Sequence, residues 1–179
     1  MTHACRRTMV LAAVCLTAAG AVSPRPAAAQ LGHFLNIGAG VSLPSGASGD
    51  TMKNGWLIQT MGGVTLPGGI INLRIGGTYG QSEVTAMDGG TATATSIMTG
   101  VMLTPIAIDI VVPYALADIG LMRASYAGSA TSFAWQVGGG LLVQTGTVGW
   151  FVESRYMQAR RAGQSGGMIP IAAGVRLMW

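Results

Sequence analysis

The sequence has few charged residues, few aromatic residues and only two cysteines. Charged residues make up 9% of the 179 residues, and the mean hydropathy is +0.49. A soluble domain usually carries about 25% charged residues, and a chain of this length cannot hide so much apolar surface in one soluble core. The shortage of charge therefore favours a lipid bilayer as the surrounding solvent, and the length favours one domain.

The first 29 residues have the pattern of a secretory signal peptide. Arg6 and Arg7 supply a positive start, residues 9–22 form an apolar run, and residues 27–29 are three alanines before Gln30. This pattern predicts export and cleavage before Gln30, which leaves residues 30–179 as the mature domain. The alternative is a transmembrane anchor, but the run is too short to cross about 30 Å of hydrocarbon.

Removing this leader changes the charge and the cysteine count. Three of the ten basic residues precede Gln30 and all six acidic residues follow it, so the mature net charge is about +1. The basic character of the whole chain is therefore no argument for nucleic acid as a partner. Cys5 and Cys15 also lie in the leader, so the mature part has neither a disulfide framework nor a thiol-ligated metal.

After Gln30 the apolar residues alternate with period two, which is the pattern of β-strands. The longest apolar stretch, residues 101–117, contains Pro105, Asp109 and Pro113, and this argues against a spanning helix. Each alternating run is near the 9–11 residues that a tilted membrane strand needs. The runs are residues 34–43, 56–66, 70–81, 94–103, 111–123, 133–143, 148–158 and 168–179. They predict an all-β fold, an eight-stranded antiparallel up-and-down transmembrane β-barrel.

The two faces of the runs differ in kind. Leu73 and Val175 belong to the aliphatic set that is expected to face lipid, while the opposite set is mostly Gly, Ser, Asn and Gln, which suits a narrow lumen. Polar loops also alternate with shorter turns, the pattern of outer-membrane barrels with both termini on the periplasmic side. The predicted polar loops are residues 44–55, 82–93, 124–132 and 159–167, and the shorter connections are residues 67–69, 104–110 and 144–147.

Several stretches carry a resemblance to a known family. They are residues 37–44, residues 113–121, residues 151–156 together with 169–176, and the terminal aromatic Trp179. The chain resembles the small outer-membrane β-barrel family that includes opacity-type proteins. The resemblance implies a location in the cell outer membrane, with membrane lipid and the outer-membrane assembly machinery as partners and Trp179 as the assembly signal. It implies little about activity, and a monomer is the favoured state.

Five ionisable residues are expected to face the lumen. Because charges inside a closed barrel must be paired or hydrated, they predict an internal network of ion pairs and hydrogen bonds, in which Glu153 has an Arg partner on a neighbouring strand. The alternative is a selectivity lining for a narrow pore. The five residues are Arg74, Asp118, Glu153, Arg155 and Arg176. Asp118 departs from the Gly that the family commonly has there.

No residue pattern indicates catalysis, a cofactor or a metal. His33 is the only histidine after Gln30, no Ser is spaced to pair with it, and Ser154 falls on the apolar face. Most of the Trp and Tyr residues lie near strand ends, as in membrane-interface girdles, whereas Tyr114 is assigned to the lumen. The function expected is a structural or surface-exposed integral outer-membrane β-barrel; the alternatives are a narrow porin-like channel and a secreted calycin-like ligand-binding barrel.

Overall fold

The computed structural model describes residues 31–48, 51–85, 90–125, 128–161 and 164–179. The predicted signal peptide and its cleavage before Gln30 lie outside these residues. Over the described ranges, no helix has the length and apolarity that a membrane-crossing helix requires. The described helical structure is a single 3-10 turn, η1 (Gly46–Ser48).

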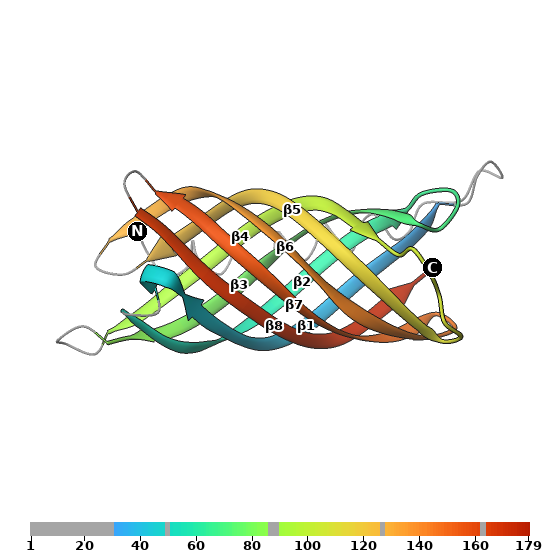
Figure 1. Ribbon diagram of the computed structural model, residues 1–179, viewed down its shortest axis with the longest axis horizontal. Helices are drawn as coiled ribbons and strands as arrows, with labels where there is room; N and C mark the ends of the chain where they lie inside the picture. Colours follow the sequence, from blue (N-terminus) through green and yellow to red (C-terminus); the bar gives the residue numbers. More distant parts are fainter. Residues whose placement is uncertain (1–30, 49–50, 86–89, 126–127, 162–163) are drawn as a thin grey trace, which may run out of the picture. The chain divides into compact units, whose positions relative to one another are not determined.

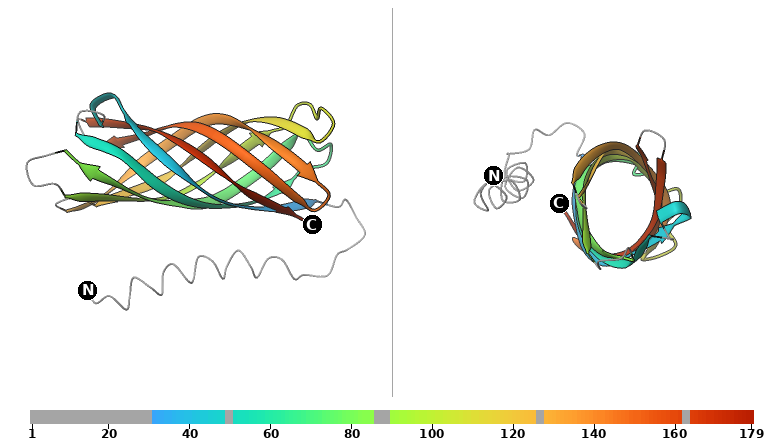
Figure 2. Two further views of the ribbon diagram at one scale, coloured as in Figure 1. Left: turned by 90° about the horizontal axis from the view of Figure 1, so that it is seen from below. Right: turned by 90° about the vertical axis from the view of Figure 1, so that its left-hand side faces the viewer.

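Eight strands form a closed barrel in which each strand pairs with the next one in the sequence and β8 returns to β1 (Figure 1). Every pairing is antiparallel. Seen along the barrel axis, the strands make one continuous ring (Figure 2). The strands are β1 (Gly32–Ser45), β2 (Met52–Thr65), β3 (Ile71–Val84), β4 (Thr91–Leu103), β5 (Val111–Ser125), β6 (Ser129–Thr145), β7 (Val148–Arg161) and β8 (Gln164–Met178). The predicted eight-stranded antiparallel barrel is therefore confirmed.

The strands are longer than the sequence runs, and the connections are correspondingly shorter. The ladder continues into residues that were predicted as polar loops; Ser125 pairs with Ser129, and Arg161 pairs with Gln164. As a result the predicted difference between long and short connections is largely absent: residues 46–51, 85–90, 126–128 and 162–163 connect strands at one end, and residues 66–70, 104–110 and 146–147 at the other. Polar composition does not mark the strand ends, because each strand of a closed barrel pairs with both neighbours and can extend beyond the apolar band.

We call the end of the barrel where Leu31 and Trp179 lie the termini end, and the opposite end the loop end. Over much of the wall between them, exposed and buried side chains alternate. On β3, Leu73 is exposed and Arg74 is buried, and on β8, Ile171 is exposed and Ala172 is buried. Aliphatic side chains thus stand on the outer surface of the closed sheet, the reverse of a soluble barrel, which hides its apolar face inside.

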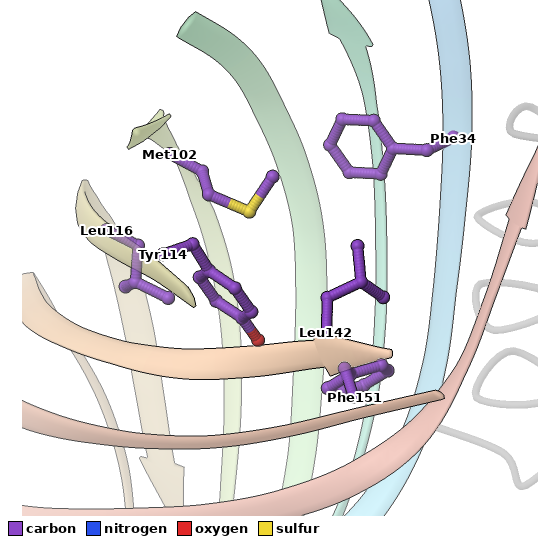
Figure 3. Close-up of a cluster of buried hydrophobic side chains, with 6 residues drawn as sticks. All are labelled: Phe34, Met102, Tyr114, Leu116, Leu142 and Phe151. Atoms are coloured by element: carbon purple, nitrogen blue, oxygen red, sulfur yellow. The ribbon is translucent and has the colours of Figure 1, made fainter. Parts of the chain in front are cut away.

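The lumen is filled by side chains in layers. One apolar cluster lies toward the termini end and consists of Phe34, Met102, Tyr114, Leu116, Leu142 and Phe151 (Figure 3). A second cluster borders a cavity at the loop end and consists of Met61, Met98, Ala134 and Ala159. Ala159 and Met122, which packs against the cluster, both line that cavity. Between these clusters lie four charged residues that the sequence assigns to the lumen, Arg74, Asp118, Glu153 and Arg155, whereas the fifth, Arg176, contacts Phe34 and Met102 of the termini-end cluster.

Candidate functional site

Four of the five predicted lumen residues form one group, which we call the charged layer. It consists of Arg74 on β3, Asp118 on β5, and Glu153 and Arg155 on β7. Period two places each of them on the inner face, since their sequence neighbours Leu73, Ile119 and Val152 are exposed on the outside. The charged layer is therefore built by side chains that reach inward from three separate strands.

Asp118 is held from two sides. Arg74 Nε lies 3.3 Å from Asp118 Oδ1. Gln136 on β6 donates from Nε2 to Asp118 Oδ2 at 2.5 Å. The carboxylate thus has a cation from β3 and an amide donor from the adjacent strand, as a charge removed from water requires.

Glu153 is the centre of the layer. Its Oε1 accepts a hydrogen bond from Gln59 Nε2 at 2.7 Å and lies 3.5 Å from Arg155 Nε. Its Oε2 accepts a hydrogen bond from Tyr114 OH at 3.0 Å and lies 3.8 Å from Arg74 Nη1. Arg155 in turn donates from Nη2 to Gln59 Oε1. Each carboxylate oxygen therefore has one hydrogen-bond donor and one cation.

The cations near Glu153 differ from the sequence prediction. That prediction required an Arg from a neighbouring strand, whereas Arg155 is on the same strand and Arg74 is on β3, which lies across the barrel from β7. The expectation of a neighbouring-strand partner is therefore wrong. The lumen is narrow enough for side chains to meet across it, which period two and strand order do not reveal.

The charged layer is closed to water. The side chains of Arg74 and Asp118 are 0% exposed, and those of Glu153 and Arg155 at most 1%. None of these four side chains therefore borders a water-filled passage in this structure.

Glycines on the intervening strands make the room for this packing. A Cβ at Gly100, which lies between Arg74 and Asp118 in the register, would come within 2.5 Å of Asp118 Oδ1. A Cβ at Gly140 would come within 2.7 Å of the Tyr114 ring. The glycines thus permit a close approach of large polar side chains from the neighbouring strands.

Arg176 lies apart from the layer. Its Nε donates to Asn36 Oδ1 on β1 at 2.8 Å, and its guanidinium carbon stands 4.4 Å from the centre of the Phe34 ring and 6.0 Å from that of Tyr114. In the register Arg176 pairs with Gly149, four residues along β7 from Glu153, or roughly 13 Å. This offset explains why the expected pairing of Arg176 with Glu153 is absent, and a cation–π contact takes its place.

The remaining candidates have simple surroundings. The His33 ring stacks on Trp179 with the ring centres 6.2 Å apart, and Ser154 is exposed on the outer face. Among the described residues, no three His, Cys, Asp or Glu side chains are grouped as metal ligands would be.

The sequence reasoning missed the neutral members of the site. Gln59, Gln136 and Asn36 are buried and each hydrogen-bonds a charged lumen residue. Their position on the inner face could have been read from alternation, but their partners lie on strands whose stagger the sequence does not give.

No protein-family model and no curated protein matches this sequence. Solved structures do match. Neisserial surface protein A has a TM-score of 0.66 and 20% identity, over 82% of this chain and 97% of that one. The outer membrane protein OprG from Pseudomonas aeruginosa has a TM-score of 0.59 and 8% identity, over 84% and 97%. Ail, the attachment invasion locus protein of Yersinia pestis, has a TM-score of 0.50 and 15% identity, over 83% and 99%.

These identities are low, so the likeness concerns the fold. It extends over 97–99% of each of these neighbours. The chain has the fold of the small eight-stranded outer-membrane β-barrels.

Proposed function

We propose that this protein is an integral outer-membrane β-barrel with a structural or surface-exposed role and no catalytic site. The observation that carries the proposal is the combination of an aliphatic outer wall with a charged layer that closes the lumen. The first feature suits a bilayer as solvent, and the second suits a barrel that does not conduct.

The outer wall supports insertion into a membrane. Large aliphatic side chains such as Ile37, Ile97 and Ile119 are more than half exposed on the outer surface, where water would make a patch of that extent unfavourable. Tilted aromatic pairs stand nearer the loop end, Trp56 with Tyr79 and Trp135 with Tyr156, at 5.7 and 5.8 Å between ring centres. Trp150 and Trp179 stand at the termini end. Aromatic residues at both margins of an apolar band are typical of membrane interfaces.

The charged layer argues against the porin-like alternative. Ions need a hydrated path, and the buried side chains of Arg74, Asp118 and Glu153 leave no room beside them for water. The calycin-like alternative requires a polar exterior and is disfavoured by the aliphatic wall.

Refolding from urea into detergent and into lipid vesicles tests membrane insertion. The folded barrel is expected to resist SDS until it is boiled and to migrate differently before and after heating. Reconstitution into planar bilayers then tests the lumen: the wild-type chain should give no steady conductance. A folded protein that stays in the aqueous phase, or a wild-type barrel with a steady open channel, would contradict the respective half of the proposal.

Trp179 remains a proposed assembly signal. His33 N donates to Trp179 O at 2.9 Å, and Trp179 N donates to His33 O at 3.1 Å. These two bonds end the β1–β8 pairing, so a purely structural role of Trp179 is the competing explanation. Trp179→Ser should reduce outer-membrane assembly in cells but leave spontaneous refolding into vesicles unchanged. His33→Ala, which removes the stacking partner and keeps the terminal aromatic, is the matched control and should assemble normally.

A second candidate function is the binding of a small neutral apolar molecule at the loop end. The cavity there has a volume of about 210 Å³, and its described lining contains methionines, alanines, glycines, prolines and hydroxyl residues but no charged side chain. Methionine side chains adapt to irregular apolar ligands. A neutral naphthyl dye should bind the refolded barrel, and Ala94→Phe, which fills the cavity, should weaken binding. Ala115→Phe on the outer surface is the control, and equal binding by both variants would dismiss the cavity.

A further inference from the structure

The β4–β5 connection, residues 104–110, is an unusual turn for the end of a membrane barrel, because three of its seven residues are isoleucines. Ile106 is 63% exposed and Ile108 is 66% exposed, as much as Ile97 in the middle of the wall at 65%. Ile110 in the same connection and Ile70 at the end of the β2–β3 turn are also exposed. We call Ile70, Ile106, Ile108 and Ile110 the isoleucine ledge. It lies at the end of the barrel where the chain terminates (Figure 1).

The ledge is fixed in place by backbone hydrogen bonds. Ile108 and Val111 bond each other in both directions, at 2.8 and 3.0 Å, around a turn in which Asp109 has a φ of 57°. Thr104 N donates to Ile70 O, and Gln144 N donates to Ile110 O, both at 2.8 Å. The connection is thus tied to the strands on both sides, and its apolar side chains have a defined position.

The ledge continues the lipid-facing wall. Ile71 and Leu103 form the last pair of the β3–β4 ladder, and both are exposed on the outer surface. The next contact beyond them is the hydrogen bond from Thr104 to Ile70 that begins the ledge. The apolar surface therefore extends past the end of the ladder on this side of the barrel.

Farther round the same end, the rim from β6 to β8 is built differently. Its connection, between β6 and β7, is Gly146-Thr147, flanked by Thr145. The outward aromatic residues described at this end are Trp150 on β7 and Trp179 after β8. Trp rings favour the membrane interface, whereas isoleucine favours the hydrocarbon. β4 and β8 lie across the barrel from each other, so the two kinds of rim face opposite directions.

We infer that the isoleucine ledge is covered by the acyl chains of the nearer leaflet, so that the barrel sits unevenly in the bilayer, with its β3–β5 rim sunk deeper than its β7–β8 rim. This inference rests on the proposed membrane insertion. Lipid is favoured over a protein partner because the ledge is entirely aliphatic, whereas protein interfaces are enriched in aromatic residues and Arg. The neighbouring Asp109 is the one charged residue of the β4–β5 connection. A local deformation of the bilayer or a tilt of the barrel follows from such uneven apolar height.

Site-directed spin labelling tests the ledge. Cys5→Ser and Cys15→Ser remove the two native thiols from the full chain, and single cysteines are then introduced as Ile108→Cys, Thr147→Cys or Ile97→Cys. Each labelled protein is refolded into vesicles of phosphatidylcholine with phosphatidylglycerol. Power saturation compares collisions with oxygen, which concentrates in hydrocarbon, and with a water-soluble nickel chelate.

The ratio of oxygen to nickel collisions should be several-fold higher at position 108 than at position 147, which is the matched polar position at the same end. A label at 108 as accessible to nickel as the label at 147 overturns the inference. Low collision rates with both reagents, or dipolar broadening between labels at 108, overturn it too, in favour of contact with a second copy. Ile97 distinguishes this failure from failure of the proposed function, since a nickel-accessible label there means that the barrel is not inserted. If Ile108→Cys does not refold, Ile106→Cys carries the same test.

Discussion

Arg74 on β3 and Asp118 on β5 meet at 3.3 Å over the strand that separates them, and β4 has Gly100 at the position between them. A larger residue there would occupy the space through which the two side chains reach each other. The Arg74–Asp118 ion pair therefore depends on the absence of a side chain at Gly100.

Gly100→Ala is expected to destabilise the folded barrel by about 1–3 kcal/mol, because the added methyl group overpacks the lumen. Gly62→Ala is the matched control, since a Cβ there would meet only the Phe34 carbonyl oxygen at 3.8 Å. Urea unfolding in vesicles, followed by Trp fluorescence, measures the difference. Equal stability of the two variants would mean that the lumen at Gly100 relaxes freely.

Breaking the Arg74–Asp118 pair should be costly, and removing both charges much less so. Arg74→Gln leaves the buried Asp118 without its cation, which costs about 3–5 kcal/mol. Asp118→Asn costs less, because Glu153 still lies 3.8 Å from Arg74. The double variant should lose less than the sum of the single variants. A double-mutant cycle in urea measures this coupling, and additive single effects would contradict the ion-pair network.

The exposed pair Lys53–Glu83 is the natural contrast. Lys53 Nζ lies 3.0 Å from Glu83 Oε2, and the two side chains are 62% and 69% exposed. Because water screens the two charges, this ion pair contributes little to stability. Removing both charges should change the free energy of unfolding by less than about 1 kcal/mol.

A double-mutant cycle for Glu153→Gln with Arg176→Gln should show weaker coupling than the cycle for Arg74 with Asp118, because Tyr114 separates Glu153 from Arg176.

The cation–π contact of Arg176 makes a separate prediction. Arg176→Lys keeps the charge but loses the planar group over Phe34 and the hydrogen bond to Asn36, so a loss of about 1–3 kcal/mol is expected. Phe34→Leu in the Lys background should cost less than Phe34→Leu in the wild type. Equal costs in both backgrounds would show that the ring packs without interacting with the cation.

On the lipid face, Leu73→Arg and Val175→Arg should each cost about 2–4 kcal/mol near the middle of the bilayer. Thr147→Arg at the rim is the control and should cost about 0–1 kcal/mol. Refolding into vesicles followed by urea titration gives the three values. Stabilities for Leu73→Arg and Val175→Arg as high as that of the control would mean that these positions are not in hydrocarbon.

The predicted cleavage before Gln30 stays a prediction. Mass spectrometry of protein purified from the cell envelope should find a mature N-terminus at Gln30. Recovery of the uncleaved chain beginning at Met1 in the envelope would disprove it.

Much of the fold follows from local chemistry in the sequence. Alternation assigns Arg74, Glu153 and Arg176 to the inside because a strand has a strict period of two, and the burial of all three agrees. The partners of these residues could not be predicted in the same way. Whether Glu153 meets Arg176 or Arg74 depends on the stagger between strands and on the diameter of the lumen, and both are properties of the closed barrel.

The ends of the strands could not be predicted from the sequence either. Ser125 and Ser129 read as loop residues because they are polar and small, yet they pair in the ladder. In a barrel without edges, pairing with both neighbours can hold a polar segment extended, whatever its intrinsic preference.

The hydrogen bond from Arg176 to Asn36 joins residues that are 140 positions apart in the chain. It links the last strand to the first, so it can form only when the ring of strands is complete. Until then Arg176 lacks both Asn36 and the Phe34 ring, and a bare guanidinium facing lipid tails is unfavourable. We therefore expect the final strand to reach its partner before its arginine leaves water, so that barrel closure and membrane insertion are coupled.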